Sequence, residues 1–461
     1  MDIRELQDKK ICILGFGREG QAVLRAIETF APDASVTIAD KSPEVESGKW
    51  KVESESNLPL SVFRLAFRCG KNYLQSLTDF DYIIKSPGVP PCPELDAVKE
   101  KVINSTQIFL DSIASSGATV IGVTGSKGKS TTASLISEIL KNAGKDVHLV
   151  GNIGNPAISL ISKAKEGTIF VIEMSSYQLM NLTVSPHIAV ITSFFPEHLD
   201  YHASTSLNAS CSPLENYLEA KKHITRFQTE NDIVFFNSES KGAKEIADES
   251  SGNKISVDAQ QSPLPLKKTK LIGTHNLTNI ALASAVAKHL EISDEATAQA
   301  ITGFNPLPHR LQQCGEHHGI EWVDDSISTT PESTIAALEA LEGKVKTLIL
   351  GGQDRGLDFT ELGKAVAKAH VDTVILMGES APRIKKALED ANVLADFHEA
   401  ASMEEAVKLA RTHTSSQSPK SLVLKSQIPI CLLSPASPSY GMFKDFEERG
   451  EAFLACITKG A

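Results

Sequence analysis

The chain has 461 residues, of which 41% are hydrophobic and 22% charged, and its formal net charge is −11. This composition is typical of globular proteins, and at about 150 residues a domain the length predicts about three domains. The acidic balance argues against a nucleic-acid partner, because a general nucleic-acid surface requires clustered Lys and Arg. The seven cysteines include no Cys-x-x-Cys pair, so we expect neither a disulfide framework nor a zinc site, and we expect a reducing cytoplasm. We also expect no signal peptide and no membrane anchor, because the start is charged and no apolar run reaches ~18 residues.

The first segment is predicted to form a βαβ unit of the dinucleotide-binding kind. A strand at 10–14 leads into Gly15-Phe-Gly-Arg-Glu-Gly20, and a second strand at 35–39 ends at Asp40, about 20 residues after the glycines. Such a glycine turn is weak evidence alone, because tight packing of a strand on a helix also requires it. A third strand at 82–84 precedes Ser86-Pro87-Gly88, which is either a rigid binding loop or a plain turn.

Residues 122–131, Gly-Val-Thr-Gly-Ser-Lys-Gly-Lys-Ser-Thr, follow an apolar strand and open a helix. Glycines let backbone N–H groups converge on phosphate oxygens, and the helix points its positive end at them. Lys129 is expected to reach the β/γ-phosphates, and Ser130 or Thr131 to hold Mg²⁺. Gly122 and Gly128 are separated by one residue more than the general motif has, but the chemistry that a nucleotide requires is present.

The rest of the chain alternates strands and helices, which predicts two further open and mostly parallel sheets. Strands are expected at 146–150, 169–172, 188–191 and 234–236, with a helix at 277–290. A third segment is expected to have strands at 320–323, 347–350, 373–377 and 430–433, and helices at 332–341 and 403–412. The predicted domains are 1–115, 116–310 and 311–461.

Two candidate metal ligands follow predicted strands of the second segment. Glu173 comes directly after one strand, and His198 lies a few residues after another. Ligands of open α/β sheets bind beyond the carboxyl ends of the strands, so both should face the same crevice as the phosphate loop. They could hold a second Mg²⁺ that serves a reacting carboxylate or acyl phosphate. The alternatives are an acid at a helix start for Glu173 and a capping or core histidine for His198.

Other polar residues are open to two interpretations. Asn152 either donates to a substrate or forms an Asn turn, and the spacing around Lys221 is that of a lysine on a helix surface. Strand-end loops that carry Arg355, Ser439 and Tyr440 suit a small carboxylate, which Arg binds bidentately, or are structural turns.

Several motifs occur together in the order found in one family of enzymes. They are Gly122–Thr131, Glu173-Met-Ser-Ser-Tyr-Gln178, His198, His275-Asn276, Pro308-His309-Arg310, Asp325-Ser326 and Ser434-Pro435-Ala436. Over essentially its whole length the chain resembles the Mur ligases, the ATP-dependent amino-acid ligases of peptidoglycan synthesis. The resemblance implies an α/β fold of three domains: an N-terminal Rossmann-like domain that binds UDP, a central P-loop ATPase domain, and a C-terminal Rossmann-like domain that binds the amino acid.

The resemblance also implies roles for individual residues. The catalytic set is Lys129, Glu173, His198 and Lys221, of which Glu173, His198, Lys221 (as a carbamate) and Ser130 hold metal. ATP is bound by Gly125, Ser126, Lys127, Gly128, Lys129, Ser130, Thr131, Asn276, Asn279, Arg310 and Asp325, with His309 nearby. The UDP-muramoyl substrate is bound by Gly15, Gly17, Arg18, Asp40, Ser86, Pro87, Gly88, Asn152, Ser175 and Gln178. Glutamate is bound by Thr329, Arg355, Ser439, Tyr440 and Phe446.

The implied reaction joins glutamate to UDP-N-acetylmuramoyl-L-alanine through an acyl phosphate, with ATP, Mg²⁺ and a monomeric enzyme. His198 and His309 are the candidates for the base that deprotonates the amine. The chain departs from the common pattern of the D-glutamate branch in three places: Ser-Ile-Ser-Thr-Thr-Pro follows Asp325, Arg355 replaces a lysine, and about ten residues look inserted at 204–213, before Lys221. D-glutamate is favoured and L-glutamate is the alternative. More distant alternatives are a folylpolyglutamate synthase, which lacks the uridine-binding domain, and a non-catalytic nucleotide-binding or GTPase-type module.

Overall fold

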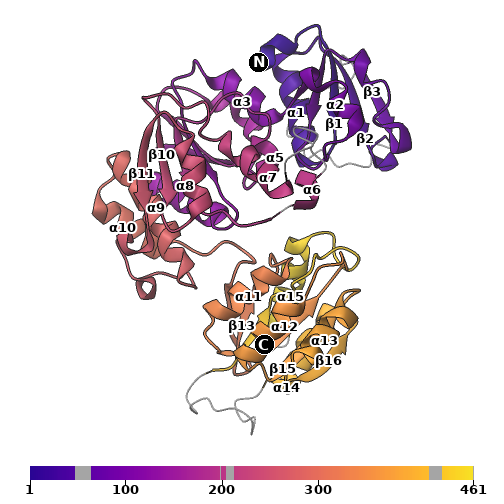
Figure 1. The fold of residues 1–461 in the computed structure, drawn as a ribbon, viewed down its shortest axis with the longest axis vertical. Helices are drawn as coiled ribbons and strands as arrows, with labels where there is room; N and C mark the ends of the chain where they lie inside the picture. Colours follow the sequence, from indigo (N-terminus) through magenta and orange to yellow (C-terminus); the bar gives the residue numbers. More distant parts are fainter. Residues whose placement is uncertain (47–63, 198, 204–211, 415–427, 460–461) are drawn as a thin grey trace. The chain divides into compact units, whose positions relative to one another are not determined.

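The computed structural model describes residues 1–46, 64–197, 199–203, 212–414 and 428–459 (Figure 1). Its contacts group the chain into two compact units, and each is described by itself. The first unit comprises 1–265 and 277–304, and the second comprises 266–276 and 305–461. Among the described residues, no helix combines the length and the apolar character that crossing a bilayer requires.

The first unit begins with a parallel sheet of five strands in the order β3-β2-β1-β4-β5. The strands are β1 (Lys10–Leu14), β2 (Ser35–Asp40), β3 (Arg64–Cys69), β4 (Tyr82–Lys85) and β5 (Val102–Ile103). The accompanying helices are α1 (Arg18–Phe30), α2 (Pro93–Asp96) and α3 (Ser105–Ile113). The predicted strands at 10–14, 35–39 and 82–84 are therefore confirmed, and their carboxyl ends carry the glycine turn, Asp40 and the Ser86-Pro87-Gly88 loop.

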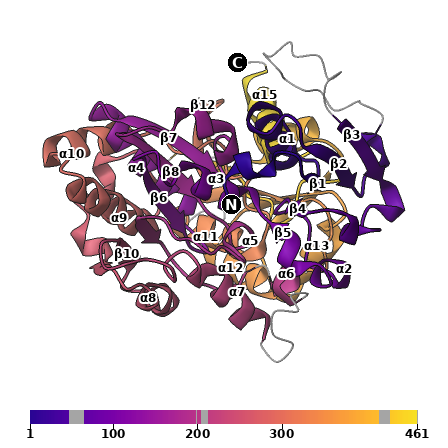
Figure 2. The same cartoon turned by 90° about the horizontal axis from the view of Figure 1, so that it is seen from above.

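The second sheet has six parallel strands in the order β11-β10-β9-β6-β8-β7. They are β6 (Thr119–Thr124), β7 (Asp146–Gly151), β8 (Thr168–Glu173), β9 (Ile188–Ile191), β10 (Ile233–Asn237) and β11 (Asn253–Val257). Strands β8 and β9 are buried throughout, as expected of a parallel sheet covered on both faces. Helix α4 (Lys129–Asn142) packs on β6, β7 and β8 (Figure 2). The remaining helices are α5 (Ser176–Leu179), α6 (Leu199–Ala203), α7 (Pro213–Lys222), α8 (Lys241–Asp248), α9 (His275–His289) and α10 (Asp294–Gly303).

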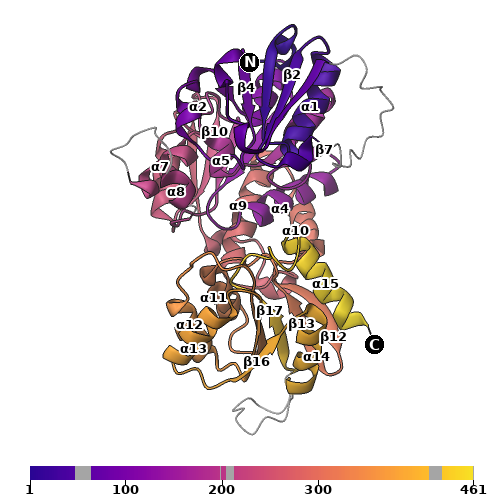
Figure 3. The same ribbon diagram turned by 90° about the vertical axis from the view of Figure 1, so that its right-hand side faces the viewer.

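The second unit holds a six-stranded sheet in the order β12-β13-β17-β14-β15-β16. The strands are β12 (Gln312–His317), β13 (Ile320–Asp324), β14 (Val345–Gly351), β15 (Thr373–Met377), β16 (Asp396–Ala400) and β17 (Ile430–Leu433), and only the β12–β13 pair is antiparallel among those described. Helices α11 (Pro331–Ala340), α12 (Thr360–Ala369) and α13 (Ala381–Asp390) cover one face (Figure 3). Helices α14 (Met403–His413) and α15 (Phe446–Thr458) cover the other.

The strands that the sequence did not reveal are mostly at sheet edges. Strands β12 and β16 have few buried residues, and β3 and β11 are the terminal strands of their sheets. An edge strand needs no continuous apolar run, because one of its sides faces water. The predicted α/β architecture with three sheets is confirmed, whereas the domain boundaries at 115 and 310 stay a prediction.

Candidate active site

The phosphate loop connects the buried strand β6 with the N-terminus of α4. Gly125 has φ +150°, and a Cβ there would lie 2.0 Å from Thr192 Oγ1. Gly128 has φ +86°, and a Cβ there would lie 2.4 Å from Asn279 Oδ1. Both positions therefore require glycine, because any side chain would strain the backbone and collide with a neighbour. The loop brings its backbone close to Thr192, after β9, and to Asn279, on α9.

Side chains from neighbouring segments fix this loop. Ser126 Oγ donates to Phe195 O at 2.9 Å and lies 2.9 Å from the Tyr217 hydroxyl. Lys129 Nζ donates to Ser126 O at 2.8 Å, so this ammonium lies directly over the loop. The neighbouring Lys127 is 46% exposed at its side chain and pairs with Glu197 at 2.8 Å. The two lysines of the loop therefore have different environments, and only Lys129 is folded onto the backbone that would hold phosphate.

Glu173 ends the buried strand β8 and is 1% exposed. Its Oε1 accepts a hydrogen bond from Asn152 Nδ2 at 2.8 Å, and its Oε2 is buried without a hydrogen-bond partner. The alternative that Glu173 is an acid at a helix start is wrong, because α5 begins only after the capping residue Ser175. A buried carboxylate oxygen without a donor is costly, and a cation would satisfy it.

The residues around this carboxylate fit a magnesium ion that is shared with a nucleotide. Mg²⁺ prefers oxygen ligands and is usually held by one or two carboxylates together with substrate phosphates. Glu173 supplies such an oxygen, and the hydroxyls of Ser130 and Thr131 lie in the first turn of α4. Within the described residues, no group of three or more His, Cys, Asp and Glu could hold a metal by itself. The predicted ligand His198 lies outside the described residues.

Lys221, in the last turn of α7, is 1% exposed, so its assignment to a helix surface is wrong. Its Nζ donates to Gly125 O at 2.8 Å and to Thr124 Oγ1 at 3.3 Å, and it lies 4.9 Å from the centre of the Tyr217 ring. Burial, and then the nearby charge of Lys129, hold the pKa of Lys221 well below its usual range. Burial therefore disfavours the charged form of this amine compared with an exposed lysine.

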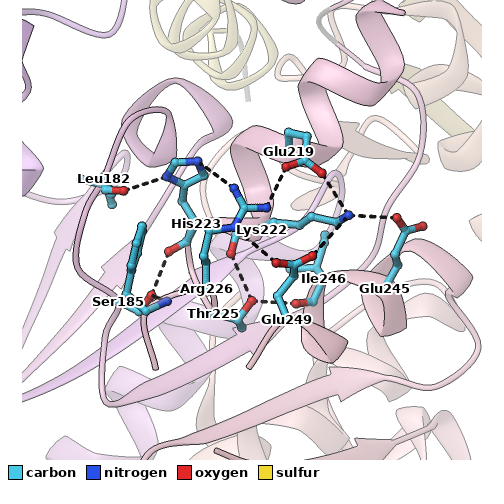
Figure 4. Close-up of polar contacts among 11 residues, drawn as sticks. Leu182, Ser185, Glu219, Lys222, His223, Thr225, Arg226, Glu245, Ile246 and Glu249 are labelled. Atoms are coloured by element: carbon cyan, nitrogen blue, oxygen red, sulfur yellow. Dashed lines mark hydrogen bonds and ion pairs between the residues drawn. The ribbon is translucent and has the colours of Figure 1, made fainter. Parts of the chain in front are cut away.

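A network of ion pairs ties the turn that carries Lys221 to helix α8 (Figure 4). The next residue, Lys222, has different partners and lies 3.0 to 3.5 Å from three carboxylates. Arg226 donates to two of the same carboxylates, at 2.7 and 3.3 Å. The carboxylates are Glu219, Glu245 and Glu249. The side chains of both cations are partly shielded from water, and the network fixes the end of α7 against α8.

The predicted UDP-muramoyl residues gather at the carboxyl ends of β1, β2 and β4. Ser86 Oγ donates to Gly15 O at 2.7 Å, and the two oxygens of Asp40 accept from Phe16 N and Ser42 N, each at 2.7 Å. Arg18 Nη2 reaches Gly151 O at 3.5 Å. The set brought together here is Gly15, Gly17, Arg18, Asp40, Ser86, Pro87 and Gly88. Their contacts with a substrate stay a prediction.

The other members of that predicted set lie at the ends of β7 and β8. Asn152 is exposed and binds Glu173 through its side chain. Ser175 and Gln178 form a capping box, in which Gln178 Oε1 accepts from Ser175 N at 3.0 Å. Both therefore have a structural role in starting α5, in addition to any contact with substrate.

The residues predicted near adenine have internal partners as well. Asn276 Nδ2 donates to Ile272 O at 2.7 Å. Asp325 is buried, and its oxygens accept from Leu311 N at 3.2 Å, from Ser328 Oγ at 2.5 Å and from Ser434 Oγ at 2.7 Å. Burial raises the pKa of Asp325 to about 6 despite these donors. Asp325 thus fixes the segment that carries His309 and Arg310.

The predicted glutamate residues lie at the ends of three adjacent strands, β13, β17 and β14. The Arg355 guanidinium lies 5.5 Å from the centre of the Tyr440 ring, and Arg355 is exposed. Ser439 is buried and Thr329 is partly buried. The set is Thr329, Arg355, Ser439, Tyr440 and Phe446, which the fold brings to one edge of the sheet as expected of a binding site in an open α/β sheet.

The structure also reveals two sets of buried polar contacts that the sequence pattern did not show. His309 Nδ1 lies 2.7 Å from Asp324 Oδ2, and the pair is buried. Arg449, on α15, is 2% exposed and donates to Ser326 O at 2.8 Å and to Ser437 O at 3.0 Å. In the sequence Arg449 follows two glutamates and resembles a surface residue. Its burial depends on contacts with distant strand-end loops, which no local signal reveals.

The His309–Asp324 pair gives a testable pH dependence. The hydrogen bond with Asp324 raises the pKa of His309 above its usual value. The stabilisation that the protonated His309 gains from Asp324 is therefore complete below the unfolded pKa of about 6.5. It is lost as pH rises through the pKa of His309 in the folded state. We expect the free energy of unfolding of wild type to exceed that of His309→Asn, and we expect this difference to be larger at about pH 6 than at about pH 9. Asparagine tolerates the positive φ of this position (+60°). Urea unfolding of both proteins at both pH values measures the difference, and a margin independent of pH would contradict the prediction.

Comparison with known proteins agrees with this arrangement. Residues 123–263 match the Mur ligase middle domain, and residues 309–426 match the Mur ligase glutamate ligase domain. The chain is 32% identical to UDP-N-acetylmuramoylalanine–D-glutamate ligase of Streptococcus mutans, covering 98% of this chain and 97% of that protein. It is 31% identical to the enzyme of the same name from Symbiobacterium thermophilum, covering 97% and 98%. The fold also matches the crystal structure of MurF ligase from Thermotoga maritima in complex with ADP, with a TM-score of 0.58 at 16% identity, covering 100% of this chain and 97% of that one. The chain belongs to the Mur ligase family.

Proposed function

We propose that this protein joins D-glutamate to UDP-N-acetylmuramoyl-L-alanine at the expense of ATP, in the cytoplasmic synthesis of peptidoglycan precursors. The full-length similarity to two D-glutamate ligases supports the substrates. The observation that carries the proposal is the arrangement at the ends of β6 and β8. A phosphate loop, the buried carboxylate of Glu173 and the buried amine of Lys221 meet there. A protein that only bound nucleotide would not need the last two.

The chemistry requires activation of the substrate carboxylate, because an oxide is too poor a leaving group for an amine to displace. A carboxylate oxygen first attacks the γ-phosphorus of ATP, and ADP leaves. A base first takes one proton from the glutamate ammonium; the neutral nitrogen then attacks the acyl carbon, and phosphate leaves and takes up the second proton of the nitrogen. The loop N–H groups and Lys129 stabilise the charge that develops on the transferred phosphoryl group. Mg²⁺, held by Ser130, Glu173, His198 and carbamylated Lys221, would add positive charge at the phosphate oxygens.

Other residues of the chain orient the reactants in this proposal. The loops at Gly15–Arg18, Asp40 and Ser86–Gly88 hold the uridine diphosphate end of the sugar nucleotide. Asn276, Asn279, Arg310 and Asp325 surround the adenine and ribose. Arg355 binds a glutamate carboxylate through its planar guanidinium, which matches two carboxylate oxygens better than a lysine does.

The proposal is tested by measuring phosphate release with ATP while each substrate is omitted in turn. We expect release to require both UDP-N-acetylmuramoyl-L-alanine and glutamate, and D-glutamate to be used at least about 100-fold faster than L-glutamate, as expected of a site that places the reacting groups precisely enough to distinguish two stereoisomers. Equal ATP hydrolysis without either substrate would rule out the ligase. Preference for L-glutamate would keep the reaction and reverse the chirality, and turnover of a folate with glutamate would favour the synthase alternative.

A further inference from the structure

Lys85 is a buried charged residue to which the proposed reaction assigns no role. It ends β4 and directly precedes Ser86-Pro87-Gly88, and it is 9% exposed. Its Nζ donates to Val89 O at 2.7 Å, to the Tyr201 hydroxyl at 3.1 Å and to Ser86 O at 3.4 Å. All three acceptors are uncharged, so Lys85 uses its ammonium to hold the loop that follows it.

Tyr201, on α6, contacts the same loop together with Lys85. Its hydroxyl lies 3.2 Å from Pro87 O and 3.1 Å from Val89 O, while it accepts from Lys85. Its ring packs on that of Tyr177, on α5, with ring centres 3.9 Å apart. Tyr201 therefore connects the Ser86–Val89 loop with α5, whose capping residues are predicted to bind substrate.

These contacts determine which groups the loop presents outward. The carbonyl oxygens of Ser86, Pro87 and Val89 are all directed at Lys85 or Tyr201. A carbonyl carries partial negative charge at its oxygen, so a carbonyl that faced an anionic diphosphate would repel it. Turning these oxygens inward leaves the loop compatible with an anionic ligand.

Stability does not explain why the position is a lysine. Burial lowers the pKa of Lys85 to about 8, and the effect of Cys92 acts in the opposite direction. The pKa of Lys85 is lower in the folded chain than in the unfolded one, so its ammonium is less favourable in the folded state. At neutral pH the charged form of Lys85 therefore opposes folding. An apolar residue of similar length removes this penalty but also removes the donor to Ser86 O and Val89 O, so the two effects on stability should largely offset each other.

We propose that Lys85 and Tyr201 form a positioning pair, which holds the Ser86–Val89 loop in the conformation that accepts the diphosphate end of the nucleotide sugar. The inference rests on the proposed function, which places that diphosphate at this loop. It adds two residues that act on the substrate through the loop, without touching the reacting atoms.

The test compares Lys85→Met and Tyr201→Phe with wild type in three measurements. We measure the Kd for UDP by calorimetry, the KM for each substrate, and Tm. For Lys85→Met we expect the Kd for UDP and the KM for the sugar nucleotide to rise about tenfold, equivalent to ~1.4 kcal/mol. For Tyr201→Phe we expect about threefold, because Lys85 keeps its two carbonyl partners. The KM for ATP should not change, and the Tm of Lys85→Met should lie within about 2 °C of wild type or above it.

Lys101→Met is the matched control. Lys101 Nζ also donates to two backbone carbonyls, Thr78 O at 2.8 Å and Phe80 O at 2.7 Å, but it lies away from the Ser86–Val89 loop. The Lys101→Met variant should therefore bind UDP with the same Kd as wild type. If wild type and Lys85→Met bind UDP equally, the inference is overturned while the proposed function stands; if Lys85→Met does not fold, Tyr201→Phe decides in the same way. If wild type itself does not bind UDP, the proposed function fails and the pair loses its role with it.

Discussion

Replacing Lys129 with alanine is expected to reduce turnover by about 10³-fold or more, while the protein stays folded. Lys129 opens α4, and its ammonium lies over the loop backbone, 2.8 Å from Ser126 O. Phosphoryl transfer places negative charge at this point, and alanine supplies nothing to balance it. The native state loses the hydrogen bond to Ser126 O, and hydrogen bonds of charged groups contribute about 1.5 to 3 kcal/mol, which is less than the stability of a typical domain. Single-turnover phosphate release together with thermal unfolding measures both effects.

Lys127→Ala is the control for this experiment, because the two lysines are two positions apart in the same loop. Lys127 is largely exposed and pairs with Glu197, and exposed ion pairs contribute at most about 1 kcal/mol. The resemblance includes Lys127 among the ATP-binding residues, but its ammonium pairs with Glu197, whereas that of Lys129 lies over the loop backbone. The removal of Lys127 should therefore change turnover by less than about tenfold. Equal losses in the two variants would mean that the general positive charge of the loop matters, and that Lys129 has no special position.

The features that the sequence predicted well depend on local rules. Gly125 and Gly128 could be placed in a phosphate loop because only glycine permits their backbone conformation, and that requirement is visible in the residue type itself. The buried strands β8 and β9 were predicted because a continuous apolar run of this length is typical of a covered parallel strand. Glu173 could be placed at a strand end for the same reason.

Residues whose environment depends on distant segments could not be predicted in this way. Lys221 and Lys222 are adjacent and identical, yet one is buried against the phosphate loop and the other is held in a network of carboxylates. The helix period places them on different faces, but it does not show which face meets the loop. Only the resemblance to the family indicated Lys221.

The same limit applies to the division of the chain. The segment 266–276 belongs with the second unit, although the rest of α9 belongs with the first. Ile272 packs on the core of the C-terminal sheet, a contact with residues far away in the sequence. The boundary near residue 310 stays a prediction, and composition and strand order do not show which distant segments pack together.

Replacing Glu173 with glutamine is the second change with a large expected effect, a loss of turnover of about 10² to 10³-fold. The side chain keeps its shape, and a glutamine oxygen can still accept from Asn152 Nδ2, which now binds Oε1 at 2.8 Å. What disappears is the negative charge on a buried oxygen that has no hydrogen-bond partner. If that oxygen holds Mg²⁺, the concentration of Mg²⁺ that gives half-maximal activity should rise at least about tenfold, since one tenfold step in affinity corresponds to only 1.4 kcal/mol.

Glu166→Gln makes the same chemical change just before the other end of β8, where the side chain is exposed, and it should leave both turnover and the Mg²⁺ requirement unchanged. The free energy of unfolding should change by less than about 2 kcal/mol in Glu173→Gln, because one buried polar atom replaces another. A metal site and a structural carboxylate thus give opposite results. If Glu173 binds metal, Glu173→Gln changes the Mg²⁺ requirement and leaves the fold intact. If Glu173 is only structural, Glu173→Gln lowers Tm, and the folded protein keeps the Mg²⁺ requirement of wild type.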